Sequence, residues 1–226
     1  MLVLEGLTLV PRVLSYALIP TMAALHPKDA AAVTALYRRG CKYLLLAGLP
    51  VAVFGFLASG PFIALLFGPD YAPSVAASRI LLPAAAFMFL SNFGETTLAC
   101  VNRWRTIVVV STLTLVLNVG LNLLWIPTHG FLGSSWATLV TEAFYFAVGA
   151  AALHSYGLRA AWLSSAWRPL AATAVFAATL WAGRGLPLLA ISVLASVVFC
   201  AATLAFGVWD EKERALVAGW WRRATA

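Results

Sequence analysis

The sequence alternates between long apolar segments and short polar stretches along its whole length. Seven apolar segments stand out, at 2–22, 43–67, 80–101, 107–126, 131–153, 169–182 and 186–208. About 20 predominantly apolar residues are enough for a helix to cross the hydrocarbon core of a bilayer. Most of the segments reach that length, although 169–182 is shorter and rich in alanine. The pattern predicts an all-α, polytopic membrane bundle of about seven transmembrane helices.

The composition agrees with a membrane protein and narrows its chemistry. Of the 226 residues, 62% are hydrophobic and only 10% are charged, which is more apolar surface than a soluble core of this size needs. The three cysteines, Cys41, Cys100 and Cys200, show no disulfide or metal-ligand spacing. The sequence therefore predicts neither a metal nor a cofactor.

The basic residues that give the net charge of +7 lie mainly in alternate loops and in the C-terminal tail. The first, third and fifth loops and the tail hold twelve Lys and Arg residues, whereas the second, fourth and sixth loops hold two. Because basic residues gather in cytoplasmic loops, we expect the C-terminal tail in the cytoplasm and the first residue outside. This distribution explains the charge without a nucleic-acid partner. We also expect residues 30–42 to lie along the inner headgroups and 209–226 to form a cytoplasmic amphipathic tail.

Two carboxylates lie inside predicted spans, Glu95 in 80–101 and Glu142 in 131–153. A charge at that depth costs at least about 2.5–3.5 kcal/mol on insertion scales and usually faces a partner or a watery path. Helical periodicity adds further polar residues to these and neighbouring faces: Ser91, Asn92 and Thr96 with Glu95, Asn118 with Asn122, and Ser135 and Thr138 with Glu142. The faces are candidate cavity linings. The competing interpretation is hydrogen-bonding glue between helices, with a structural ion pair for the charges.

The first span contributes Glu5 and Arg12, which are seven residues apart and share a helical face. About 10 Å of helix axis separates them, too far for direct contact without help. In the predicted topology Arg12 and Glu142 both lie near the midplane. Arg12 is therefore placed either to neutralise Glu142 or to bind an anionic ligand. Phosphate suits a guanidinium because its donors match two oxygens at once.

The sequence shows no enzyme signature. It lacks H-E-x-x-H, G-x-S-x-G, a Walker loop and a paired acidic metal motif. The three histidines, His26, His129 and His154, lie in or beside loops and far apart in sequence, so we interpret them as solvated. We expect no catalytic residue.

Three stretches together resemble the polysaccharide and oligosaccharide-lipid exporters, the bacterial flippase branch of the multidrug/oligosaccharidyl-lipid/polysaccharide exporter superfamily. The first, LSYALIP at 14–20, ends a span in proline just before a basic segment. The second, LLFGPDY at 65–71, is similar to the family's short outer loop. The third, NVGLNLLWIPTHGFLGSSW at 118–136, is similar to an asparagine span, a proline–glycine turn and a helix start leading to Glu142. The resemblance covers about residues 5–150.

The resemblance implies two helical lobes that face each other across a central cavity. This chain matches the second lobe, with 1–153 as a core of five spans, 154–208 as two additional spans and 209–226 as the tail. Met1 opens directly into an apolar run, which fits either a reverse-anchor helix or the later part of a longer chain. Departures from the family pattern are Thr128-His129 in the turn and Ser134-Ser135 where alanines are more usual.

The function that the resemblance implies is the flipping of a lipid-linked oligosaccharide across the bacterial inner membrane by alternating access. Its partners would be membrane lipid, the glycan substrate and the missing N-terminal lobe. One competing function is a cation-coupled multidrug antiporter, in which Glu95 or Glu142 carries the coupling ion. Two further alternatives are that the chain is a membrane-embedded glycan-transferring enzyme or a structural membrane subunit.

Overall fold

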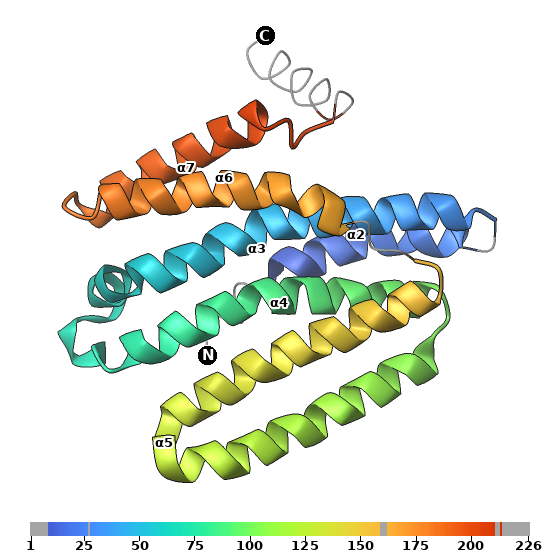
Figure 1. Cartoon of the computed structure of the whole chain (residues 1–226), viewed down its shortest axis with the longest axis horizontal. Coiled ribbons are helices and arrows are strands. Elements are labelled where there is room, and N and C mark those ends of the chain that lie inside the picture. Colours follow the sequence, from blue (N-terminus) through green and yellow to red (C-terminus); the bar gives the residue numbers. More distant parts are fainter. Residues whose placement is uncertain (1–8, 27, 159–161, 211–212, 214–226) are drawn as a thin grey trace. The chain divides into compact units, whose positions relative to one another are not determined.

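The computed structural model describes residues 9–26, 28–158, 162–210 and 213, and these residues are almost entirely helical. Their helices are α2 (Leu9–Leu25), α3 (Ala30–Phe67), α4 (Ser74–Cys100), α5 (Trp104–Ser155), α6 (Trp162–Ala182) and α7 (Leu188–Ala205), with a short 3₁₀ turn at Pro69–Tyr71 (Figure 1). No strand occurs among the described residues. The prediction of an all-α fold is confirmed.

Four of these helices, α3, α4, α5 and α7, are long and apolar enough to cross a membrane. They indicate a multi-pass membrane protein, as the apolar pattern predicts. The helices α2, with 17 residues, and α6 are not among the four. The number of seven spans stays a prediction. Most of the predicted tail, 209–226, lies outside the described residues.

The helix α3 corrects one expectation. The sequence predicts residues 30–42 along the headgroups, separate from the span 43–67, but α3 runs unbroken through both for 38 residues. Asp29 begins it, accepting a hydrogen bond from the backbone N–H of Ala32 at 2.9 Å. A helix of this length measures about 57 Å, whereas the hydrocarbon core is about 30 Å thick. The basic segment is therefore continuous with the apolar segment in one helix.

The helix α5 is a hairpin. Its path is broken at Gly130, which has φ 57° and ψ −137°, and the chain doubles back there into two antiparallel arms (Figure 1). Only glycine adopts such a conformation without strain. A side chain at Gly133 would collide with the backbone of Trp125 on the first arm, so the arms touch near the bend. The predicted spans 107–126 and 131–153 are these arms.

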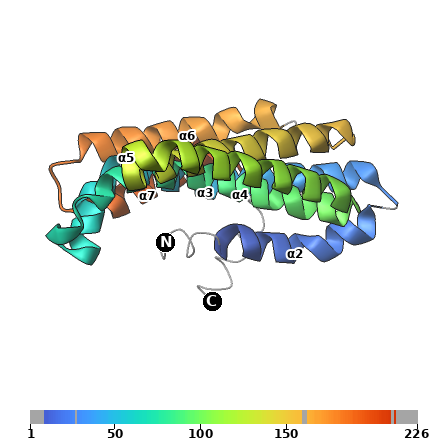
Figure 2. The same ribbon diagram turned by 90° about the horizontal axis from the view of Figure 1, so that it is seen from below.

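The chain divides into two compact units, Met1–Ala166 and Trp167–Ala226. In the first unit α3 packs along α4, α2 packs against both, and α5 packs against α4. Figure 2, seen from below, shows α2 and α5 on different sides of α4. The buried core includes Tyr37 of α3 and Phe93 of α4, whose rings stack with centroids 5.7 Å apart. A side chain at Gly40 would occupy the place of the Phe93 ring.

The second unit contains α6 from Trp167 onward and all of α7, which form a helical hairpin. Phe176 and Phe199 pack edge to face between the two helices, with ring centroids 5.8 Å apart. In the turn, the Arg184 guanidinium lies 3.6 Å from the ring centroid of Trp181. At the other end Arg168 donates to the backbone oxygen of Gly207 at 2.8 Å. Arg168 therefore joins α6 to the residues that follow α7, whereas the Arg184 stack lies between the turn and the end of α6.

Candidate functional site

The carboxylate of Glu95 is held between two apolar helices. The Tyr145 hydroxyl, on the second arm of α5, donates to Glu95 Oε2 at 2.8 Å. The same hydroxyl lies 3.4 Å from Oγ of Ser111 on the first arm. All three residues are half-buried. An acidic side chain, a phenol and a serine thus link α4 to both arms of α5.

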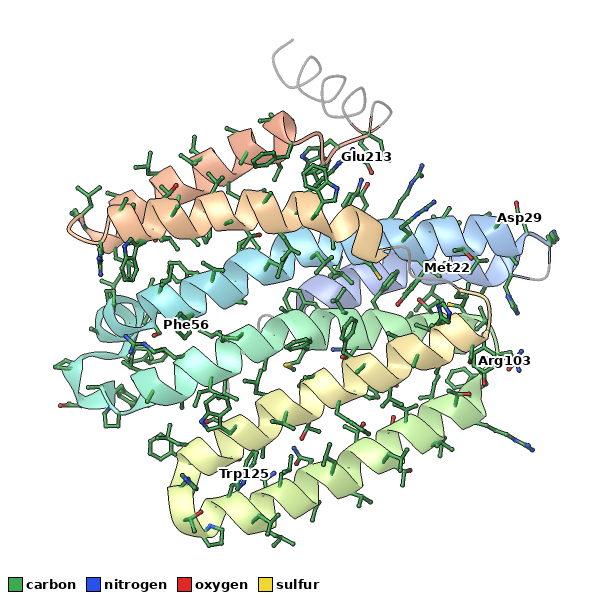
Figure 3. The ribbon with its side chains drawn as sticks, in the orientation of Figure 1. Met22, Asp29, Phe56, Arg103, Trp125 and Glu213 are labelled. Carbon is green, nitrogen blue, oxygen red and sulfur yellow. The ribbon has the colours of Figure 1, made fainter. Side chains whose placement is uncertain are left out.

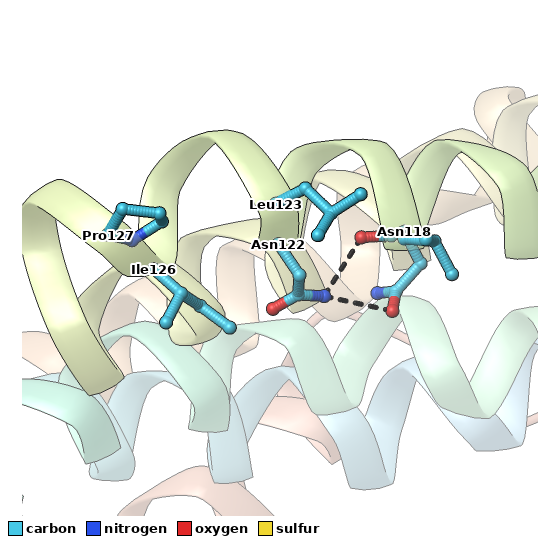
Figure 4. A pocket seen from close by; sticks show the side chains of 6 residues that line it. Asn118, Asn122, Leu123, Ile126 and Pro127 are labelled. Atoms are coloured by element: carbon cyan, nitrogen blue, oxygen red, sulfur yellow. Dashed lines mark hydrogen bonds between the residues drawn. The ribbon is translucent and has the colours of Figure 1, made fainter.

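A second polar link joins the two arms of α5 nearer the bend. Asn118 Nδ2 donates to Thr141 Oγ1 at 3.2 Å. Asn122 Nδ2 donates to both oxygens of Asn118, to the backbone oxygen at 2.9 Å and to Oδ1 at 3.0 Å (Figure 4). The Oδ1 atom of Asn122 is buried and accepts no hydrogen bond from the described residues.

The two asparagines stand at one end of an open groove along the first arm. The groove has a volume of about 300 Å³ and is lined by Asn118, Val119, Asn122, Leu123, Ile126 and Pro127 (Figure 4). All six residues belong to one helical arm, and Leu123 is 72% exposed. The groove is therefore an apolar surface with amides at one end, and not an enclosed pocket.

The other predicted polar residues of α4 and α5 bond mainly within their own helices. Asn92 Nδ2 donates to the backbone oxygen of Met88 at 2.7 Å, and Thr138 Oγ1 donates to that of Ser134 at 3.0 Å. Ser91, Thr96 and Ser135 do the same one turn back along the chain. These hydroxyls and Asn92 therefore bond within their own helices, whereas Asn118 bonds across the two arms of α5.

The charged candidates are not brought together. Glu142 is half-buried and has no hydrogen-bond or ion-pair partner in the part of the chain that the structure describes. Glu5 lies outside the described residues. Arg12 belongs to α2 by its backbone, and its side chain lies outside the described set. Because α2 packs against α3 and α4 while α5 packs against α4, the helix packing gives no support to an Arg12–Glu142 pair.

Metal-ligating and nucleophilic side chains are scattered. Among the residues searched in the described ranges, no three His, Cys, Asp or Glu side chains could hold a metal ion together. The three histidines are exposed, as predicted from their place in or beside loops. The Nδ1 atom of His129 lies 2.7 Å from the hydroxyl of Thr128.

Sequence reasoning missed two members of the site, Thr141 and Tyr145. A signal was present, because both lie on the turns that follow Thr138, at three and seven residues, on the face that carries Glu142. Threonine and tyrosine are common enough in membrane helices that neither stood out.

Models of known protein families do not match this sequence, and no curated protein matches it either.

Proposed function

We propose that this chain is one lobe of an exporter that flips a lipid-linked oligosaccharide or polysaccharide precursor across the bacterial inner membrane by alternating access. The basis is the order of the three stretches at 14–20, 65–71 and 118–136 together with polar groups retained inside membrane helices. The tail is proposed to lie in the cytoplasm, and a second lobe is proposed to complete the cavity.

The observation that carries the proposal is the hydrogen bond from Tyr145 to Glu95. A carboxylate inside apolar helices is expensive and is usually retained for function. Asn118 and Asn122 add amide groups on the first arm of α5, beside an open groove. Sugar hydroxyls and phosphate oxygens both form hydrogen bonds with amide and phenol groups. Arg12 is proposed to supply a phosphate donor from α2.

The second candidate is a cation-coupled multidrug antiporter of the same superfamily. Glu95 favours it, because a carboxylate that is held by one phenol and half-buried can take up a coupling ion. A membrane-embedded glycan-transferring enzyme belongs to a different class of protein. It requires a base and an acidic pair at a membrane face, which the sequence does not offer.

The test is complementation of a strain that lacks its polysaccharide flippase, with surface polysaccharide as the measured quantity. We expect no polysaccharide from these 226 residues alone, and restored polysaccharide when the chain is joined to a first lobe of the same family. Full activity from the chain alone would refute the two-lobe proposal. Drug resistance without polysaccharide in the joined protein would support the antiporter instead.

Tyr145 supplies a matched pair of variants for the same assay. Tyr145→Phe keeps the ring and removes the hydrogen bond to Glu95, so we expect export to fall about threefold or more, as for a hydrogen bond between membrane helices. Protein abundance should stay unchanged. The control is Tyr71→Phe, at an exposed tyrosine in the 3₁₀ turn. Equal export from both variants would remove Glu95 and Tyr145 from the proposed site.

A further inference from the structure

The end of the first unit where α4 passes into α5 carries a stacked arginine. Arg103 precedes the first residue of α5, and its guanidinium lies 4.1 Å from the ring centroid of Tyr156, which follows the last residue of the same helix. The Tyr156 hydroxyl shares a hydrogen bond of 2.7 Å with Thr106 Oγ1. The stack uses the face of the guanidinium and leaves its in-plane N–H groups for another partner.

The side chains around Arg103 mark a membrane boundary. Trp104 is 60% exposed, as expected for tryptophan at a headgroup interface. Val108 and Val109, 63% and 57% exposed, begin the apolar surface of the first arm. Five residues of helix place Val108 about 7.5 Å beyond Arg103 along the axis. Arg103 and the exposed Arg105 are therefore at headgroup level, directly above hydrocarbon.

The surrounding charge at this end of the unit is predominantly positive. The turn between α2 and α3 lies at the same end as the turn between α4 and α5 (Figures 1 and 2), and Figure 3 labels Asp29 and Arg103 there. Lys28 in that turn is exposed, as are Arg38 and Arg39 in the first three turns of α3. Asp29 is engaged with the backbone N–H of Ala32. The electrostatic potential at this end of the unit therefore attracts anions.

We propose that Arg103 and Arg105 form a binding surface for the phosphate of anionic phospholipid headgroups, with Tyr156 as the residue that positions Arg103. A guanidinium binds two phosphate oxygens at once. The acyl chains of the same lipid would pack against Val108 and Val109. A free phosphate ion has no acyl chain and cannot make this contact. This surface is separate from the residues of the proposed transport function and does not depend on it.

The test uses the full chain in detergent and counts bound lipid by native mass spectrometry. Phosphatidylglycerol and phosphatidylcholine with identical acyl chains are titrated in parallel. We expect phosphatidylglycerol to bind more tightly, and Arg103→Gln with Arg105→Gln to weaken it by about fivefold for each arginine removed. Phosphatidylcholine carries the same phosphate beside a compensating choline cation, so its binding should weaken less than that of phosphatidylglycerol. Inorganic phosphate at the same concentration should not displace the lipid.

Two further variants separate positioning from charge alone. Tyr156→Phe keeps the ring under Arg103 and should lose less affinity for phosphatidylglycerol than Tyr156→Ala does. Thermal unfolding measures whether each variant folds. Arg184→Gln is the matched control, because Arg184 also stacks on an aromatic ring, at the turn of the second unit. The proposal is overturned if the double arginine variant keeps its preference for phosphatidylglycerol, or if inorganic phosphate displaces the lipid. It is also overturned if Arg184→Gln loses as much affinity for phosphatidylglycerol as the double arginine variant does. Both arginines are exposed, so the double arginine variant decides the proposal even if Tyr156→Ala does not fold.

Discussion

The two units of the molecule satisfy their polar side chains in different ways. In the first unit many hydroxyls bond within their own helix. Other hydrogen bonds there connect one helical segment with another, from Tyr145 to Glu95, from Asn118 to Thr141 and between Tyr156 and Thr106. In the helices of the second unit the hydroxyls bond to backbone oxygens one turn earlier on the same helix, as in Thr173, Thr179, Ser192 and Ser196.

This difference indicates which unit depends more on its tertiary packing to satisfy its polar groups. A hydroxyl bonded to its own helix needs nothing from its neighbours, so the helix can face lipid on that side at little cost. A carboxylate or amide bonded across segments requires a fixed arrangement of both. The first unit therefore carries groups that depend on its tertiary packing, whereas α6 and α7 are held mainly by apolar packing and by contacts at their ends.

The largest effect should come from the aromatic core of the first unit. Phe93 is fully buried and stacks on Tyr37, so Phe93→Ala leaves a cavity and should lower the free energy of unfolding by about 3–5 kcal/mol. Phe199→Ala in α7 is the comparison, because Phe199 is only half-buried against Phe176. We expect it to cost less than half as much. Unfolding in mixed detergent micelles, followed by circular dichroism, measures both; equal losses would break the distinction between the units.

The next effect concerns the bend of α5. Gly130→Ala forces a side chain into a conformation with φ 57°, which should cost about 1–3 kcal/mol of unfolding free energy. Gly185→Ala in the turn of the second unit is the control, since a side chain there would meet no atom within 4 Å and the residue has no positive φ. We expect its unfolding free energy to change by less than about 0.5 kcal/mol. A similar cost at both glycines would show that the bend does not depend on its backbone conformation.

The smallest effect concerns the hydrogen bond between the arms. Asn118→Ala removes the bond to Thr141 and the bond that Asn118 Oδ1 accepts from Asn122, and should lower the unfolding free energy by about 0.6–1.7 kcal/mol. A double-mutant cycle with Thr141→Val should return as coupling the part of that energy that belongs to the bond between Asn118 and Thr141. Thr179→Val in α6 removes only a bond within one helix and should change stability by a few tenths of a kcal/mol. Absence of coupling between Asn118 and Thr141 would remove the basis for contrasting the two units.

The length of the apolar segments was sufficient to predict most of the helices. The segment predicted at 80–101 corresponds to α4 at Ser74–Cys100, and the break predicted between 126 and 131 contains Gly130. The continuity of α3 was not predictable from apolarity, because the basic residues of 30–42 form helix as readily as the apolar span does. Residues 30–49 contain no proline, so the helix continues through the change in polarity at Lys42.

The candidate site was predictable only in part. Glu95, Asn118 and Asn122 stood out because such groups are rare in apolar helices. Their partners did not, because the choice of Tyr145 for Glu95 depends on how the second arm of α5 is rotated against α4. That rotation is set by side-chain packing between the helices, which periodicity in one segment does not contain. The same limit applies to Asn92, which donates to the backbone oxygen of Met88 on its own helix and not to another helix.

The bend at Gly130 also has a consequence for how the protein is made. The two arms are joined by a reversal of a few residues, and Asn118 of the first arm finds its partner Thr141 on the second. A first arm that entered the bilayer alone would carry the Asn118 amide into hydrocarbon without Thr141, while Asn122 would keep its bonds to Asn118. We therefore expect the insertion machinery to hold the first arm until translation has delivered the second, and to release α5 into the lipid as a preassembled helical hairpin.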